Sequence, residues 1–91
     1  RAVVDLSGRS HLVFFAAFGD ENVGAFPTAL VREFFQAVSA HGRMNLHVDL
    51  LRSINDHHGI EAIFKAFARA LDAASLRSER IRGVPSTKGA L

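Results

Sequence analysis

The hydrophobic period of this sequence changes between residues 44 and 71, and this change constrains the fold more than any other feature. Apolar residues first occupy every second position, at Met44, Leu46, Val48 and Leu50. This is the period of a strand with one face on a core, and it places His47 on the opposite face. Apolar residues then recur at helical spacing, at Ile60, Ile63, Phe64, Phe67 and Leu71. Alanines beside this stripe keep the helix narrow, so we expect it to pack closely on a sheet.

Three further segments surround this strand and helix. Residues 2–5 and 11–18 are rich in Val, Leu and Phe, and the turn residues Ser7-Gly8-Arg9-Ser10 between them predict a hairpin. A first helix is predicted to follow Thr28 and to stop at Gly42, with its apolar positions at Leu30, Val31, Phe34, Phe35 and Val38. After Ala74 the period fades, and we expect the basic C-terminal segment, residues 75–91, to be irregular.

The order of these elements predicts an α+β fold, a two-layer α/β sandwich with both helices on one face of the sheet. We interpret residues 1–91 as a single domain. Eight Phe residues and 48% hydrophobic residues suffice for a small core but leave apolar surface for a partner to cover. The chain begins at Arg1 without a signal pattern, which favours an internal start. No apolar run reaches about 18 residues, so we expect a soluble protein with no membrane partner.

The densest group of chemically active side chains is Asn55-Asp56-His57-His58-Gly59-Ile60-Glu61, where Asn55 and Asp56 can cap the second helix. On a helix, Glu61 can share a site with either imidazole, while His57 and His58 diverge by about 100°, which suits two neighbouring ions. Without cysteine, any metal must be held by imidazole and carboxylate, which suits Mn, Zn, Fe or Ni. An exposed polar helix face is the alternative interpretation of this pattern. His11, His41 and His47 are left out of the predicted site.

Three sequence blocks occur in one order along the chain: Asp5-Leu6-Ser7-Gly8-Arg9, then Asn55-Asp56-His57-His58 with Glu61-Ala62-Ile63-Phe64-Lys65-Ala66, then Pro85-Ser86-Thr87-Lys88-Gly89. Together they closely resemble imidazoleglycerol-phosphate dehydratase. The resemblance spans essentially the whole sequence but only the C-terminal half of that family's chain, which is an internal duplication of one two-layer unit similar to a ribosomal-protein domain. It implies that a sister motif, Asp-Asp-His-His-x-x-Glu-Asp, belongs to an N-terminal half that is missing here.

The resemblance also implies roles for particular residues. The metal ligands would be His57, His58 and Glu61, with Glu33 at a position where many relatives carry a ligating His. Glu61 and Lys65 would be the catalytic residues of this half. Three residues would bind the substrate phosphate, namely Arg9, Ser86 and Lys88, because cations and a hydroxyl converging on a dianion form charge-assisted hydrogen bonds.

For the whole protein, the resemblance implies a cytoplasmic carbon-oxygen lyase of histidine biosynthesis. Two Mn²⁺ sites would support the dehydration of D-erythro-imidazole-glycerol phosphate to imidazole-acetol phosphate, in a homo-oligomer of 24 subunits. The fragment alone would be inactive. Two other interpretations remain open from the residues alone: a non-catalytic or stand-alone half-domain, and a small phosphate-binding or RNA-binding module. The second is disfavoured, and no nucleic-acid partner is expected, because the Phe residues follow core periods and the chain has no Tyr or Trp.

Overall fold

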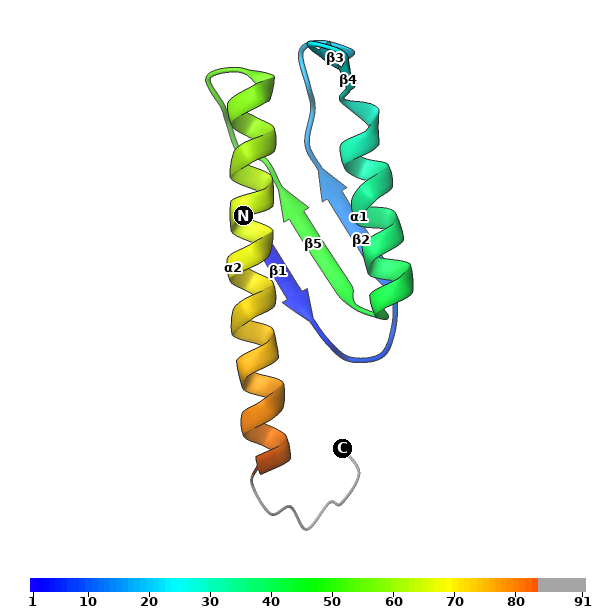
Figure 1. The fold of residues 1–91 in the computed structure, drawn as a ribbon, viewed down its shortest axis with the longest axis vertical. Coiled ribbons are helices and arrows are strands. Elements are labelled where there is room, and N and C mark those ends of the chain that lie inside the picture. The colour runs from blue at the N-terminus through cyan, green and yellow to red at the C-terminus, as the bar shows by residue number, and fades with distance from the viewer. Residues whose placement is uncertain (84–91) are drawn as a thin grey trace.

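The computed structural model of the chain describes residues 1–83 and contains a small sheet, a short hairpin and two helices (Figure 1). The sheet is built from β1 (Ala2–Asp5), β2 (His11–Phe15) and β5 (Asn45–Asp49). The hairpin consists of β3 (Asn22–Val23) and β4 (Phe26–Pro27), and the helices are α1 (Ala29–Gly42) and α2 (Asp56–Gly83). The predicted order of strand, strand, helix, strand and helix is therefore confirmed, with one additional short hairpin before α1.

The strand order in the sheet is β1-β5-β2, so the predicted hairpin between the first two strands is wrong. β5 lies between them, antiparallel to β1 and parallel to β2. Parallel neighbours need a crossover connection, and α1 supplies it between β2 and β5. The segment 6–10 has the composition of a tight turn, yet it spans the width of the central strand. Turn residues predict a reversal of direction, and the chain does reverse there, but they do not predict which strands pair.

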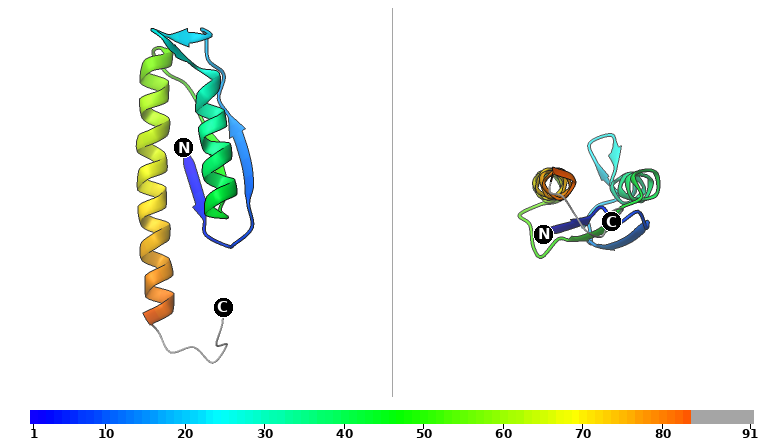
Figure 2. Two further views of the ribbon diagram at one scale, coloured as in Figure 1. Left: turned by 45° about the vertical axis from the view of Figure 1, so that its right-hand side comes forward. Right: turned by 90° about the horizontal axis from the view of Figure 1, so that it is seen from below.

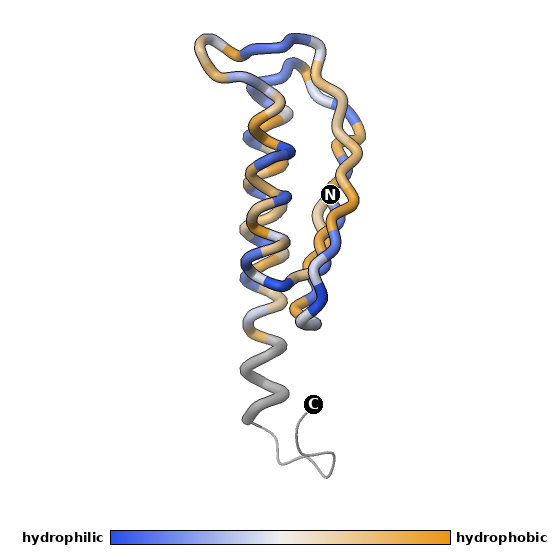
Figure 3. The backbone as a smooth tube through the Cα atoms, turned by 90° about the vertical axis from the view of Figure 1, so that its right-hand side faces the viewer, coloured by the Kyte–Doolittle hydropathy of each residue, from blue (hydrophilic) through white to orange (hydrophobic). Residues whose placement is uncertain are grey.

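Both helices cover the same face of the sheet, as predicted (Figure 2). The core between the two layers is formed by Val31, Phe35, Met44, Leu46, Val48 and Ile63. In the side view of Figure 3 the helix layer and the sheet lie next to each other, and hydrophobic residues occur in both. The apolar stripe predicted for the second helix packs on this core, because Ile63 is buried and its companions are partly buried against it.

β5 is the best-buried strand because it has a neighbour on each side and helices over one face. Leu46 is 0% exposed, and in the register of the sheet it lies between Val4 of β1 and Leu12 of β2. His47 lies on the other face between Val3 and Val13 and is exposed, as its position in the alternating pattern predicted. This second face has no covering layer within residues 1–83.

α1 ends as predicted at Gly42, but the left-handed residue that terminates the helix is Arg43, with φ 51°. The hydroxyl of the buried Ser39 donates to the carbonyl of Met44 (2.8 Å), and the Met44 N–H donates back to the carbonyl of Ser39 (3.1 Å). A side chain at Gly42 would meet Met44, since a Cβ there would lie 2.6 Å from its Cε. The glycine therefore allows the close approach of Met44, while Arg43 adopts the turn conformation.

α2 continues to Gly83, so the prediction of irregular structure after Ala74 is wrong for residues 75–83. The molecule measures 52 Å along its longest axis and about 20 Å across the others, because α2 extends beyond the end of the sheet (Figure 1). A helix that leaves its sheet has no core to face, and its hydrophobic period disappears while its backbone continues. None of the helices within residues 1–83 is long and apolar enough to cross a membrane.

The burial of Leu46 can be tested by comparing it with its neighbour on the other face. Leu46→Ala should lower the free energy of unfolding by about 2–5 kcal/mol, because it leaves a cavity under both helices. His47→Ala should change it by less than about 0.5 kcal/mol, since this side chain is exposed. Urea denaturation followed by circular dichroism measures both values. Equal losses for the two variants would contradict the assignment of the core face.

Candidate metal site

The first turn of α2 is closed by the residue that precedes it. The Oδ1 atom of Asn55 accepts the backbone N–H of His58 (2.9 Å), and the backbone carbonyl of Asn55 accepts the N–H of Gly59 (2.9 Å). A side-chain acceptor three residues before an otherwise unpaired N–H is the usual N-cap arrangement. The prediction that Asn55 caps this helix is confirmed, and the cap fixes the backbone that carries His57 and His58.

Asp56 has a different role from the cap that the sequence predicted for it. Its two carboxylate oxygens accept the backbone N–H groups of Gly19 (2.9 Å) and Asp20 (2.7 Å), which follow β2. The acidic side chain also lies in the first turn of α2, where negative charge is favourable next to the positive end of the helix dipole. Asp56 therefore ties the start of α2 to the loop after β2, a connection between residues 36 or 37 positions apart.

Gly59 allows the loop after β5 to approach the first turn of α2. The residue is buried, and a Cβ built on it would lie 3.0 Å from Ser53 Oγ and 3.1 Å from Leu50 Cδ2. A larger residue would push the loop and the helix apart. The glycine inside the His-His-x-x-Glu motif is thus required by packing, and the ligand-type side chains lie on the remaining, exposed faces of the same turn.

The two imidazoles have different partners. Nε2 of His57 lies 2.7 Å from Oε1 of Glu61, one turn further along the helix. Nδ1 of His58 instead lies 2.9 Å from Oδ1 of Asn55. The two rings are 5.6 Å apart between centroids and nearly perpendicular, at 83°. The two imidazole rings point in different directions, as expected for adjacent residues on a helix. Glu61 therefore contacts the ring of His57, whereas the ring of His58 contacts Asn55.

These donors fit part of a metal site. His57 Nε2 and Glu61 Oε1 lie 2.7 Å apart, close enough for both atoms to contribute to one cation site. Imidazole nitrogen and carboxylate oxygen suit first-row divalent metals. The His57 and Glu61 side chains are 63% and 48% exposed, and no three His, Cys, Asp or Glu side chains within residues 1–83 converge to hold an ion. Within residues 1–83, His57 and Glu61 would therefore supply only part of the coordination of a metal ion.

Of the other predicted site residues within positions 1–83, none forms a hydrogen bond or ion pair with His57, His58 or Glu61. Glu33 is exposed on α1, and Lys65 is exposed one turn beyond Glu61 on α2. Arg9 lies in the connection between β1 and β2, at the opposite end of the sheet from the start of α2 (Figure 1). Ser86 and Lys88 lie outside the described residues. Among the predicted site residues within positions 1–83, His57, His58 and Glu61 lie together at the start of α2, with Lys65 one turn further along the same helix.

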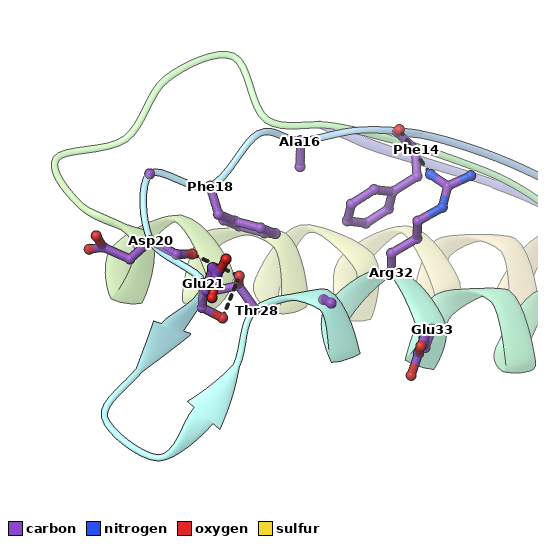
Figure 4. A pocket seen from close by; sticks show the side chains of 10 residues that line it. Phe14, Ala16, Phe18, Asp20, Glu21, Thr28, Arg32 and Glu33 are labelled. Atoms are coloured by element: carbon purple, nitrogen blue, oxygen red, sulfur yellow. Dashed lines mark hydrogen bonds between the residues drawn. The ribbon is translucent and has the colours of Figure 1, made fainter.

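A pocket of about 480 Å³ lies between the end of β2 and the first turns of α1 (Figure 4), and the sequence pattern did not predict it. Thr28 closes one end, where its hydroxyl is 2.8 Å from the carbonyl oxygen of Asp20 and 3.0 Å from that of Glu21. Arg32 donates to the carbonyl of Phe14 (3.4 Å), and its guanidinium lies 5.8 Å from the centroid of that ring. No sequence signal marked this site, because its residues come from segments that pair only in the fold.

A second hollow of about 440 Å³ lies between the two helices and is almost wholly apolar. It is lined by Phe26, Leu30, Val31, Glu33, Phe34 and Phe64. Phe34 is 46% exposed although it belongs to the helical stripe predicted to face a core. The apolar surface that the composition predicted therefore includes part of this stripe.

The fold and the site define a class of protein: a two-layer α+β unit that carries imidazole and carboxylate side chains at the start of one helix. The family model described as imidazoleglycerol-phosphate dehydratase matches residues 1–71. The chain belongs to the imidazoleglycerol-phosphate dehydratase family, which confirms the resemblance of its motifs.

Individual relatives agree with this assignment. The imidazoleglycerol-phosphate dehydratases of Halalkalibacterium halodurans and Syntrophomonas wolfei are 55% and 54% identical over the whole chain. The chain spans about half the length of these relatives, 47% and 46% respectively. The crystal structure of the enzyme from Staphylococcus aureus is 57% identical, with a TM-score of 0.75 over 77% of this chain and 41% of that one. The fold is therefore that of one half of the duplicated unit.

The tie between Asp56 and the loop after β2 gives a stability prediction. Asp56→Ala should lower the free energy of unfolding by about 1–3 kcal/mol, because two N–H groups lose a charged acceptor. Asp72→Ala, an exposed acidic residue further along the same helix, is the matched control and should have little effect. Thermal and urea denaturation measure both variants. If the two changes were equally small, Asp56 would not hold the loop against the helix.

Proposed function

We propose that this chain is the C-terminal half of a Mn²⁺-dependent imidazoleglycerol-phosphate dehydratase, which converts D-erythro-imidazole-glycerol phosphate to imidazole-acetol phosphate in histidine biosynthesis. The observation that carries the proposal is the 2.7 Å pair of His57 Nε2 and Glu61 Oε1 at the start of α2, in a chain of this family. Family membership also favours this function over a phosphate-binding or RNA-binding module.

The site would be completed by an N-terminal half. Two independent observations support this: the chain spans about half the length of its relatives, and no third ligand-type side chain joins His57 and Glu61 within residues 1–83. A regular helix cannot direct both imidazoles and the carboxylate at one ion from one side. A second half would supply further ligands, so that His57, His58 and Glu61 contribute to two Mn²⁺ sites.

His57 and Glu61 would bind the metal, and His58 would bind from the adjacent face of the helix, with Glu33 as a further carboxylate candidate. When bound, Mn²⁺ would act as a Lewis acid toward the substrate's imidazole. Glu61 Oε1 lies 2.7 Å from His57 Nε2, so the two proposed ligands already lie next to each other. Lys65, one turn further, would contact the substrate, and its ammonium would stabilise negative charge that develops there. The remaining acid or base would come from the other half.

The phosphate-binding role that we propose for Arg9 would require an assembly of several copies. Arg9 lies at the opposite end of the sheet from His57 and cannot reach a substrate bound beside it (Figure 1). We therefore propose that each site combines the α2 start of one copy with Arg9 of a neighbouring copy, together with Ser86 and Lys88. A closed homo-oligomer, 24 subunits in our proposal, satisfies this requirement and also covers exposed apolar side chains such as Phe15. We place this enzyme in the cytoplasm.

The metal ligands can be tested in a chimera that joins the N-terminal half of the Syntrophomonas wolfei relative to this chain. The chimera should bind Mn²⁺ and dehydrate the substrate, whereas the chain alone should not turn over. His57→Ala should remove bound Mn²⁺ and lower kcat/KM at least about 100-fold, since a ligand is lost. His47→Ala, on the uncovered sheet face, is the matched control. Unchanged Mn²⁺ stoichiometry in the His57 variant would refute the ligand assignment.

The sharing of sites between copies predicts complementation in the same chimera. Arg9→Ala and His57→Ala should each be inactive when prepared separately. After the two are denatured together and reassembled, about a quarter of the sites should hold both wild-type residues, because each residue comes from a different copy. Recovery of activity in the mixture measures this directly. As a control, each variant is mixed with wild-type chains to show that it still assembles. If both variants assembled in this way but their mixture had no activity, Arg9 and His57 would belong to the site of one chain.

A further inference from the structure

We propose that Asn55 is a positioning residue that sets the tautomer of His58 and thereby leaves Nε2 of that ring free to bind metal. The inference rests on the proposed function and concerns a residue outside the ligand set. It starts from one atom, Oδ1 of Asn55, which lies 2.9 Å from the backbone nitrogen of His58 and 2.9 Å from Nδ1 of the same residue.

The first contact fixes the orientation of the amide. A backbone N–H can only donate, so the Asn55 atom that faces it must be the carbonyl oxygen rather than the amide nitrogen. The cap therefore decides between the two ways in which the Asn55 amide could point. This assignment needs no assumption about protons on the histidine.

The second contact then fixes the proton on the ring. The Asn55 oxygen carries no proton and can only accept, and its two lone pairs allow it to accept from the backbone and from the imidazole together. His58 Nδ1 must therefore carry a hydrogen, and in the neutral ring Nε2 is left with its lone pair. Nδ1 faces the start of the helix, so the unprotonated nitrogen points away from Asn55.

A metal ligand benefits from such support in two ways. A ring that donates through one nitrogen is more basic at the other, and its orientation is held before the ion arrives. Within residues 1–83 only His58 has this support: Asn55 contacts its Nδ1, whereas Glu61 contacts His57 at Nε2, the nitrogen that we propose binds metal. Glu61 is a proposed ligand itself, but Asn55 acts only through His58. The same amide oxygen thus caps α2 and sets the tautomer of His58.

Three substitutions separate the cap from the tautomer. Asn55→Ala removes both contacts. Asn55→Ser retains a capping oxygen, but a hydroxyl can donate as well as accept and so imposes no tautomer. Asn55→Asp retains both accepting contacts at almost the same length. All three are made in the chimera with the N-terminal half, in which the unsubstituted protein is the reference.

Two measurements are compared for each variant: the Tm of the metal-free protein, and the Mn²⁺ dissociation constant from the electron paramagnetic resonance signal of free Mn²⁺. We expect Asn55→Ala to lower Tm and to weaken Mn²⁺ binding about 10–100-fold, the range for loss of a supporting contact. Asn55→Ser should keep a Tm near that of the reference and still bind about 10-fold more weakly. Asn55→Asp should restore both quantities.

The outcomes distinguish this inference from the function on which it rests. If the unsubstituted chimera bound no Mn²⁺, the proposed function would fail at the metal. If it bound Mn²⁺ and the Asn55→Ser variant bound equally well, Asn55 would be a helix cap alone and the inference would be overturned. The same conclusion would follow if the Asn55→Asp variant bound as weakly as the Asn55→Ser variant.

Discussion

The burial of β5 between two strands and beneath two helices is the constraint on which the rest of this structure depends. Leu46 and Val48 are almost completely buried, and they fix which face of the strand meets the helices. Because β5 runs parallel to β2, α1 must cross over between them, and α2 must start at the same end of the sheet where β5 stops. The histidine pair is thereby placed at a strand end, next to the loop that leaves β2.

The sequence predicted those parts of the fold that depend on local periods. Alternation identified the buried face of β5, and the stripe from Ile60 to Leu71 identified the face of α2, because both periods arise from neighbours in one segment. Strand pairing depends on segments far apart, and turn residues around Gly8 favoured a hairpin that β5 in fact divides. The end of α2 was missed for a related reason: a helix beyond its sheet loses its hydrophobic period but not its backbone hydrogen bonds.

In the candidate site too, the sequence could predict only the residues that lie close together along the chain. His57, His58 and Glu61 lie within five residues, so a helix alone brings them together and the sequence could predict them. The role of Asp56 could not be predicted, since its partners Gly19 and Asp20 belong to another loop. Arg9 was placed by family resemblance, and the fold of one chain leaves it at the far end of the sheet. Residues that lie at opposite ends of the sheet in one chain leave no spacing signal in its sequence.

The incomplete burial of residues 1–83 and the incomplete metal coordination that we propose for His57 and Glu61 would have one physical explanation. The hollow lined by Phe34 and Phe64 lies on the helix layer, and the exposed imidazole of His57 lies at the start of a helix in that layer. If one half already supplied every metal ligand, a second half would not improve metal binding. If one half already buried all its apolar side chains, a second half would bury no more apolar surface. The hollow and the proposed metal ligands lie in the same layer, so in the proposed enzyme a single partner surface would bury the apolar side chains and add the remaining ligands in one association.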